Sequence, residues 1–285
     1  MPNQTIPDSW PAPAKINLFL HVTGRRADGY HTLQTLFQFL DYGDALSFAI
    51  TDDGAITRAA PLAGVPEETD LTLRAARALK VAGGVDQGAR ITLTKRLPIG
   101  GGLGGGSSDA ATTLLALNRL WGLHRSPAEL ARLGVGLGAD VPVFIHGRAA
   151  WAEGVGEVLT TAEPAEAWYA VLIPPVSVST ARVFEAFQLT DFTPAITIRD
   201  FHAGRTRNEL EPVVRRLYPE VDKTLAWLRR FGDARMSGSG GCVFLPVASA
   251  DAGRALLAQC PASLASGFVA RGVNRHPLHA TIGLR

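Results

Sequence analysis

The chain has few cysteines, little net charge and no long apolar run, and each shortage excludes a class of protein. Its 285 residues contain only Cys242 and Cys260, which fit neither a disulfide framework nor a zinc-ligand spacing. The formal net charge of +2 gives no overall bias toward nucleic acid or an anionic membrane. No apolar run approaches the roughly 18 residues of a membrane-spanning helix, and the N-terminus lacks the pattern of a secretory signal. We therefore expect a cytoplasmic protein with reduced thiols and no structural metal, nucleic-acid partner or membrane partner.

Strand and helix patterns alternate along the chain, without the regular spacing of a doubly wound sheet. Residues 14–22 and 89–98 predict strands, and residues 70–83 predict a helix that stops at Gly83 and Gly84. Such a mixture favours the α+β class. A length of 285 residues fits two domains on a prior of about 150 residues each.

Two further segments bear on the domain organisation. Ser126, followed by Pro127 and Glu129, predicts the N-cap and capping box of a helix. Residues 138–154 predict a short pair of strands. The Ala-, Glu- and Pro-rich segment 162–167 predicts a linker, so we expect domains at 1–162 and 163–285.

The most informative stretch is IGGGLGGGSSDAA at residues 99–111, where six glycines fill seven positions between a predicted strand and a predicted helix. Ordered glycine costs conformational entropy, so the bare backbone needs a reason. A helix N-terminus presents unpaired N–H groups and a partial positive charge, and glycines let an anion approach that backbone closely. Ser107 and Ser108 add hydroxyl donors. A simple hinge does not require this order of glycines, serines and helix, so the stretch predicts a phosphate-binding loop.

The residues that follow the glycines distinguish this loop from two well-known phosphate-binding motifs. The loop lacks the lysine of a Walker A motif. Gly100, Gly102 and Gly105 fit G-x-G-x-x-G, but the next helix leads to another helix start at Ser126 instead of a strand ending in an acidic residue. Besides a kinase, an oxidoreductase that binds a dinucleotide and a nucleotide-binding module without catalysis remain alternatives.

Three segments carry a resemblance to a known family. PAKINLFLHVTGRRADGYHTL, KRLPIGGGLGGGSSDAAT and MSGSGGCVF resemble the three motifs of the GHMP kinases, which include galactokinase, homoserine kinase and mevalonate kinase. The strings ADGYHTLQTLFQFLDYGD and GADVPVF resemble a branch that phosphorylates the 2-hydroxyl of a polyol linked to cytidine diphosphate, in the non-mevalonate route to isoprenoid precursors. The resemblance covers nearly the whole chain and thins between about residues 189 and 230.

The resemblance implies a fold and a set of partners. The fold is a two-domain GHMP kinase, with an N-terminal domain like domain 2 of ribosomal protein S5 and a C-terminal ferredoxin-like α/β plait. The implied cofactors are ATP and Mg²⁺, and no residue is assigned as a metal ligand. The implied substrate is a small cytidine-diphosphate-linked polyol. We expect a monomer or a weak homodimer.

The same resemblance implies two catalytic residues. Asp140 of GADVPVF would accept the alcohol proton as the phosphoryl group transfers. Lys15 of PAKINL would lie near Asp140 and the acceptor oxygen and favour their negative charge. Without the resemblance, the residues alone would favour a solvated lysine flanking a strand and an aspartate in a turn.

The family pattern also places the nucleotide. The loop that would hold the ATP phosphates, with Lys95 reaching toward the nucleotide, comprises Lys95, Pro98, Ile99, Gly100, Gly101, Gly102, Leu103, Gly104, Gly105, Gly106, Ser107 and Ser108. Asparagine is common in the family where this chain has Asp109. An acidic side chain there would repel a triphosphate, so we expect Asp109 to cap the helix, where its charge suits the helix dipole.

The remaining motif positions imply a cytidine site. Tyr30 and Phe184 would sandwich the base, His31 would bond to its polar edge, and Asn17 would help to hold the substrate. Considered alone, Phe184 fits a helix-core position better than a base-stacking one. The second glycine loop would close the site with Gly238, Ser239 and Gly240, and Cys242 beside it is expected to be buried packing. The stretch RNELEP at residues 207–212 weakly resembles another family motif and predicts no role.

Overall fold

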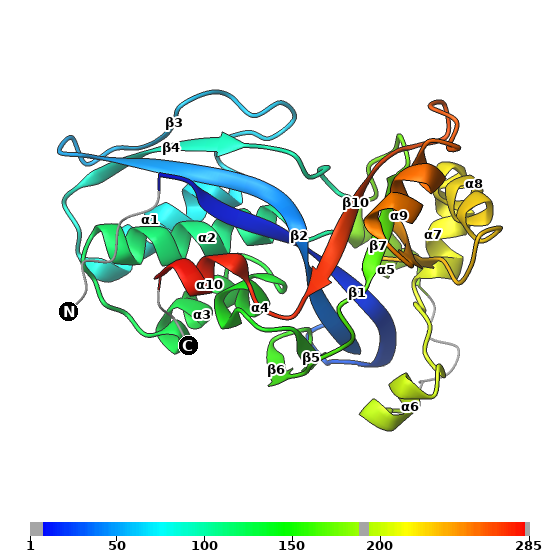
Figure 1. The fold of residues 1–285 in the computed structure, drawn as a ribbon. Helices are drawn as coiled ribbons and strands as arrows, with labels where there is room; N and C mark the ends of the chain where they lie inside the picture. The colour runs from blue at the N-terminus through cyan, green and yellow to red at the C-terminus, as the bar shows by residue number, and fades with distance from the viewer. Residues whose placement is uncertain (1–7, 188–193, 283–285) are drawn as a thin grey trace.

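The computed structural model describes residues 8–187 and 194–282. Within them, ten strands form one mixed sheet, and its helices lie in two groups (Figure 1). The α+β class predicted from the sequence is confirmed. The strands of the N-terminal half are β1 (Trp10–Arg25), β2 (His31–Thr51), β3 (Ile56–Arg58), β4 (Gly88–Thr94), β5 (Ala150–Glu153) and β6 (Val158–Thr161).

The long strand β2 organises this half. It pairs with β1, β4 and β5 in antiparallel fashion, while β3 and β4 run parallel. The pairing of β1 with β2 shifts register at three places, between Pro13 and Lys15, between Asn17 and Leu20, and between Val22 and Gly24. Such bulges bend a strand and re-aim its side chains, and the first two flank Lys15 and Asn17.

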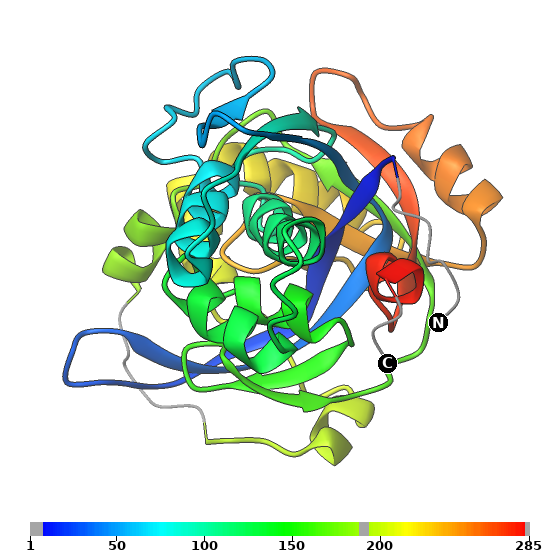
Figure 2. The same cartoon turned by 90° about the vertical axis from the view of Figure 1, so that its left-hand side faces the viewer.

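Helices cover one face of these strands (Figures 1 and 2). They bury a core that includes Phe39, Leu79, Leu114 and Phe144. Asp70 caps the first helix by accepting from Thr72 N, and Gly84 ends it in a left-handed conformation, as the sequence predicts. The helices are α1 (Leu71–Gly83), α2 (Gly105–Leu120), α3 (Pro127–Val135), α4 (Val141–His146) and, from the end of the chain, α10 (Pro277–Ile282).

One local prediction is confirmed and one is wrong. Ser126 and Glu129 form the predicted capping box at the start of α3. The predicted strand pair at 138–154 is instead helix α4 followed by β5, which pairs with β6. The apolar run that begins at Val141 is buried on all sides, so it lacks the periodicity that separates a short helix from a strand.

The C-terminal half is a β-α-β-β-α-β unit in which the strands lie in the order β10-β7-β9-β8. This is the topology of the predicted ferredoxin-like plait. Its strands are β7 (Trp168–Ile173), β8 (Arg235–Met236), β9 (Val243–Val247) and β10 (Ser266–Val273). Its helices are α5 (Thr180–Ala186), α6 (Ile198–His202), α7 (Glu211–Leu217), α8 (Pro219–Leu228) and α9 (Ala250–Leu257).

The two halves exchange elements. Val273 at the end of β10 pairs with Phe39 of β2, and Leu278 of α10 is buried in the N-terminal core. In the other direction, Leu20 and Val22 of β1 belong to the C-terminal core. The division between residues 162 and 163 therefore stays a prediction. In the ranges described, no helix is long and apolar enough to cross a membrane.

Candidate active site

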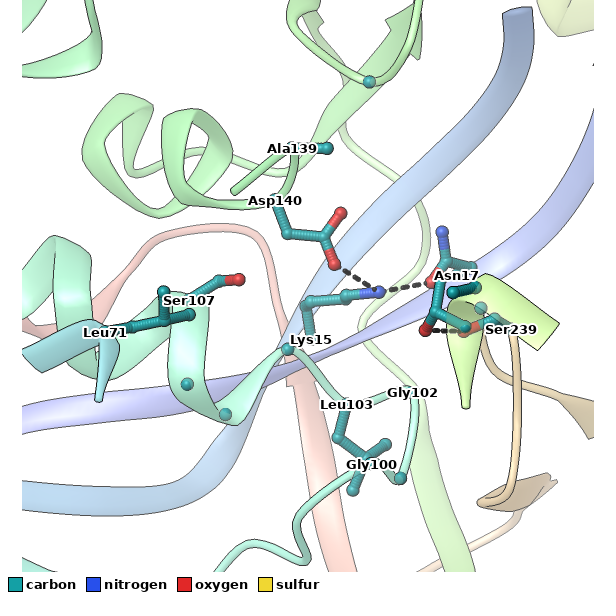
Figure 3. A pocket seen from close by; sticks show the side chains of 18 of the residues that line it. Lys15, Asn17, Leu71, Gly100, Gly102, Leu103, Ser107, Ala139, Asp140 and Ser239 are labelled. Atoms are coloured by element: carbon teal, nitrogen blue, oxygen red, sulfur yellow. Dashed lines mark hydrogen bonds and ion pairs between the residues drawn. The ribbon is translucent and has the colours of Figure 1, made fainter. Parts of the chain in front are cut away.

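A cavity of about 950 Å³ lies where the two halves meet. Its walls come from β1, β2, the glycine loop before α2, the start of α4, helix α5 and the loop before β9. Residues from all three sequence motifs thus share one cavity, although more than 200 positions separate Lys15 from Ser239 in the chain. Figure 3 shows these groups converging.

Lys15 is the buried cation of the site. Its side chain is 3% exposed, its ammonium lies 3.0 Å from an Asp140 carboxylate oxygen, and it donates to Asn17 Oδ1 at 2.6 Å (Figure 3). The ammonium also lies 5.2 Å from the centre of the Phe37 ring. A buried charge is tolerated only with such partners. The arrangement fixes one positive charge at the cavity wall.

Asp140 stands directly before α4. It occupies the N-cap position in a helical conformation, and its side chain makes no capping hydrogen bond. The carboxylate is 31% exposed and turned toward Lys15. It is therefore free to meet a ligand in the cavity, as a proton acceptor must be.

The glycine loop has the bare backbone that its sequence predicts. Gly100, Gly102 and Gly104 have φ angles of 71°, 74° and 71°, which side chains rarely adopt. A Cβ atom on Gly102 would lie 2.3 Å from the Ser237 carbonyl oxygen, and one on Gly104 would lie 3.0 Å from the Lys15 side chain. Close approach to the second loop and to Lys15 thus requires glycine at both positions.

Helix α2 begins at this loop with its first turn uncapped. Its N-cap residue is Gly104, which has no side chain to bond the first N–H groups. The first residues of the helix, Gly105, Gly106 and Ser107, line the cavity, and their N–H groups have no carbonyl partner within the helix. Ser108 is fully buried and does not line the cavity. The loop can receive an anion through main-chain N–H groups and the helix dipole.

Asp109 does not cap α2, which corrects that expectation. It lies one turn inside the helix, is 2% exposed, and pairs with Lys95 at 2.9 Å. Lys95 also pairs with Asp44, a β2 residue that the sequence analysis did not single out. Gly104, which has no side chain to place, takes the cap position instead.

Two members of this group of three, Asp109 and Lys95, have shifted pKa values. Burial raises the pKa of Asp109 to about 7, with Lys95 opposing the rise and the Asp44 carboxylate adding to it. Burial acts to lower the pKa of Lys95, but the Asp109 and Asp44 carboxylates raise it overall. Lys95 lines the cavity beside Gly105, yet its charge is already shared between two carboxylates.

Aromatic side chains also line the cavity. Tyr30 is 67% exposed, and the His31 ring stacks on Phe184 with centroids 5.3 Å apart. Burial, with the nearby charge of Arg25 as a smaller cause, lowers the pKa of His31. In this structure His31 covers a face of Phe184, so the sandwich between Tyr30 and Phe184 stays a prediction.

The second glycine loop is tied to the first. Ser237 Oγ donates to the Gly102 carbonyl at 2.9 Å and accepts from Asn17 N at 3.2 Å. Ser239 and Gly238 line the cavity, whereas Gly240 packs against Met236 and Val214 behind it. The predicted group of Gly238, Ser239 and Gly240 is thus only partly at the wall.

Asn208 is a structural residue of the site to which the sequence analysis gave no role. Its side-chain amide donates to the carbonyls of Met236 and Gly238 at 2.9 and 2.8 Å. Its Oδ1 accepts from Leu210 N. It therefore holds the backbone on both sides of Ser237. The RNELEP stretch was the only signal for it.

The architecture around the loop also bears on one of the open alternatives, an oxidoreductase that binds a dinucleotide. Helix α2 leads to α3 and α4, and the next strand, β5, pairs with β2 and β6 and not with β4. The parallel neighbours β3 and β4 enclose α1, so the glycine loop does not lie between the first strand and the helix of a β-α-β unit, as it does in a dinucleotide-binding fold. A dinucleotide-dependent oxidoreductase is therefore not supported.

Comparison with known proteins defines the class. The model of the GHMP kinase N-terminal domain matches residues 70–148, and that of the C-terminal domain matches residues 184–265. The chain belongs to the GHMP kinase family. A mevalonate kinase crystal structure, 17% identical, shares this fold with a TM-score of 0.68, covering 94% of this chain and 99% of its own.

Many closer relatives carry one name. The 4-diphosphocytidyl-2-C-methyl-D-erythritol kinases of Thiobacillus denitrificans and Alkalilimnicola ehrlichii are 55% and 58% identical to this chain. The matches cover 95% and 93% of this chain, and 97% and 90% of those proteins. A crystal structure of 4-(cytidine 5'-diphospho)-2C-methyl-D-erythritol kinase is 35% identical with a TM-score of 0.81, covering 93% of this chain and 98% of its own.

Proposed function

We propose that this GHMP kinase transfers the γ-phosphoryl group of ATP to the 2-hydroxyl of 4-diphosphocytidyl-2-C-methyl-D-erythritol, releasing ADP. The observation that carries the proposal is the meeting of Lys15, Asp140 and the uncapped start of α2 in one cavity. Identities above 50% to kinases of that name support the choice of substrate.

The uncapped N-terminus of α2 supplies the nucleotide end of the site. Its N–H groups and the glycine backbone suit the β- and γ-phosphates, because they offer donors without a side chain in the way. Gly102 and Gly104 pack too closely against Ser237 and Lys15 to carry a side chain, which supports a role for the loop as bare backbone. These residues hold the phosphate tail while the acceptor alcohol approaches from the Asp140 side.

Asp140 takes the proton of the acceptor. As the alcohol oxygen bonds to the γ-phosphorus, its proton passes to a carboxylate oxygen of Asp140, and the bond from the γ-phosphorus to the bridging oxygen breaks. That electron pair leaves on ADP. Lys15 directs two of its three N–H donors at Asp140 and Asn17, which leaves one for the acceptor oxygen as negative charge develops there.

We assign Mg²⁺ to the phosphates of the nucleotide alone. Magnesium is held largely by substrate phosphates and water with one or two carboxylates, and it neutralises charge on the phosphates. Across residues 8–187 and 194–282, no group of three His, Cys, Asp or Glu side chains is arranged to hold a metal. We therefore assign the ion no protein ligand.

The test offers ATP and Mg²⁺ with four alcohols: the cytidine-linked methylerythritol, mevalonate, homoserine and galactose. We expect ADP release, with a new phosphomonoester in the ³¹P NMR spectrum, only with the first. Turnover of another alcohol alone would overturn the substrate and leave the family intact. ATP binding without turnover of any of the four would favour a non-catalytic nucleotide-binding module and overturn the proposal.

A further inference from the structure

The side chain of Asn17 lies between Lys15 and a residue that the mechanism above does not use. Asn17 Oδ1 accepts from the Lys15 ammonium at 2.6 Å, and Asn17 Nδ2 donates to Thr35 Oγ1 at 2.8 Å. Thr35 is on β2 and is fully buried. The chain of contacts therefore runs from Thr35 through Asn17 and Lys15 to Asp140.

The bulge in β1 places the Phe19 carbonyl where the Thr35 hydroxyl can donate to it. Because Asn17 pairs with Phe37 and Leu20 with Thr35, Leu18 and Phe19 together lie opposite a single residue of β2. The Phe19 carbonyl accepts a hydrogen bond from the Thr35 hydroxyl. The one hydroxyl proton of Thr35 is thus committed to an oxygen that can only accept.

That commitment fixes the orientation of the Asn17 amide. With its proton given to Phe19, Thr35 can offer Asn17 only a lone pair, so the NH₂ end of the amide must face Thr35. The oxygen end then faces Lys15, whose ammonium can only donate. A reversed amide would set NH₂ against the ammonium and draw the Thr35 proton away from the buried Phe19 carbonyl.

We propose that Thr35 is a positioning residue of the reaction: it holds the Asn17 amide oxygen on Lys15, and so holds the ammonium between Asn17 and Asp140. Without the Thr35 hydroxyl, the Asn17 NH₂ group is left unsatisfied, and it can turn toward the Asp140 carboxylate in competition with Lys15. The statement about catalysis rests on the proposed function. The statement about the Asn17 amide does not.

The first arm of the test needs no substrate. In a ¹⁵N-labelled protein, the side-chain NH₂ resonances of Asn17 are identified by their loss in Asn17→Asp. We expect slow exchange with solvent in the wild type and in Thr35→Ser, and exchange at least tenfold faster in Thr35→Val. The matched control is Thr224→Val, which removes another fully buried hydroxyl bonded to a carbonyl, that of Glu220, in α8.

The second arm is kinetic. We expect kcat to fall about tenfold in Thr35→Val with KM for ATP unchanged, and Thr35→Ser to recover most of the loss because it restores the hydroxyl. Thr224→Val should lose stability without losing kcat. If Thr35→Val is not obtained folded, Thr35→Cys replaces it, because sulfur fits the space and accepts poorly.

Each result separates the two proposals. Equal loss of kcat in Thr35→Ser and Thr35→Val would show that packing matters and the hydroxyl does not, which overturns the positioning role. Unchanged exchange of the Asn17 amide in Thr35→Val would overturn it as well. A wild type that phosphorylates none of the alcohols would overturn the proposed function, and the exchange measurement would still decide whether Thr35 orients Asn17.

Discussion

Lys15 and Asp140 form an ion pair whose two ends differ greatly in exposure. The ammonium and the carboxylate lie 3.0 Å apart, yet the lysine side chain is 3% exposed and the aspartate side chain 31%. The positive end is fixed in the wall by β1 and Asn17, while the negative end faces the cavity. The pair can therefore remain in place while a substrate hydroxyl reaches the carboxylate.

Replacing Lys15 tests the role of the buried charge. In Lys15→Met we expect kcat to fall by about 10²–10³, because one preorganised positive group at the reacting oxygen is lost. Stability should change little, since Asp140 can be solvated and the methionine fills the space of the alkyl chain. Steady-state kinetics and urea unfolding measure the two effects. Lys223→Met, at an exposed lysine of α8, is the control, and a kcat in Lys15→Met within threefold of it would contradict the role.

Replacing Gly102 tests whether the first glycine loop binds the ATP phosphates. In Gly102→Ala the new Cβ atom meets the Ser237 carbonyl, and the φ angle of 74° adds strain of about 1–3 kcal/mol. We expect a lower melting temperature and at least tenfold weaker binding of a non-hydrolysable ATP analogue, measured by calorimetry. Gly136→Ala is the control because its Cβ would meet nothing closer than 3.6 Å. ATP-analogue binding of Gly102→Ala equal to that of the control would count against phosphate binding by this loop.

The raised pKa of Asp109 predicts that the stability of the protein depends on pH. Its pKa is raised from 3.8 to about 7 in the folded protein, so between about pH 4 and 7 the folded state binds more protons than the unfolded chain. The free energy of unfolding contributed by this group therefore decreases as the pH rises through that window. In Asp109→Asn the decrease should disappear. In urea unfolding, the free energy of unfolding of the variant relative to the wild type should be higher at pH 8 than at pH 5. An equal difference at the two pH values would refute the raised pKa of Asp109.

Replacing Phe184 tests whether its ring stacks on the cytidine base. Base stacking on an aromatic ring contributes about 1–3 kcal/mol, so Phe184→Ala should raise KM for the cytidine-linked substrate by about 5–150-fold. KM for ATP and kcat should remain close to the wild type. Phe231→Ala removes a partly exposed ring beyond α8 and is the matched control. If both KM values rise together in Phe184→Ala, Phe184 is a packing residue and not a base platform.

Local sequence patterns predicted the parts of the site that local physics determines. The glycine loop, its following helix and the capping box at Ser126 depend on neighbouring residues only, and they are where the sequence places them. The ferredoxin-like plait could be predicted only through the family resemblance. Its pairing of β10 with β7 joins segments about 100 residues apart, which no local pattern can predict.

The errors and omissions share a physical cause. The charge of Asp109 suits the helix dipole and so favours a cap on α2, but the partly buried Lys95 gives that charge a stronger partner. Asp44, Asn208 and Thr35 are ordinary polar residues in the sequence. Their importance comes from contacts across the fold, such as Asn208 bonding to Met236, which no local pattern encodes. The sequence of helix α4 resembles that of a strand because both can be short, apolar and fully buried.

The most direct test of the account is the kcat of Asp140→Asn with the cytidine-linked substrate, measured beside the affinity of the same variant for an ATP analogue. The amide keeps the size and the position of the carboxylate but cannot accept the alcohol proton. We expect kcat to fall by about 10²–10⁴ with ATP-analogue affinity within threefold of the wild type. A variant that retains near-normal kcat would show that no proton passes to Asp140, and would contradict the central claim.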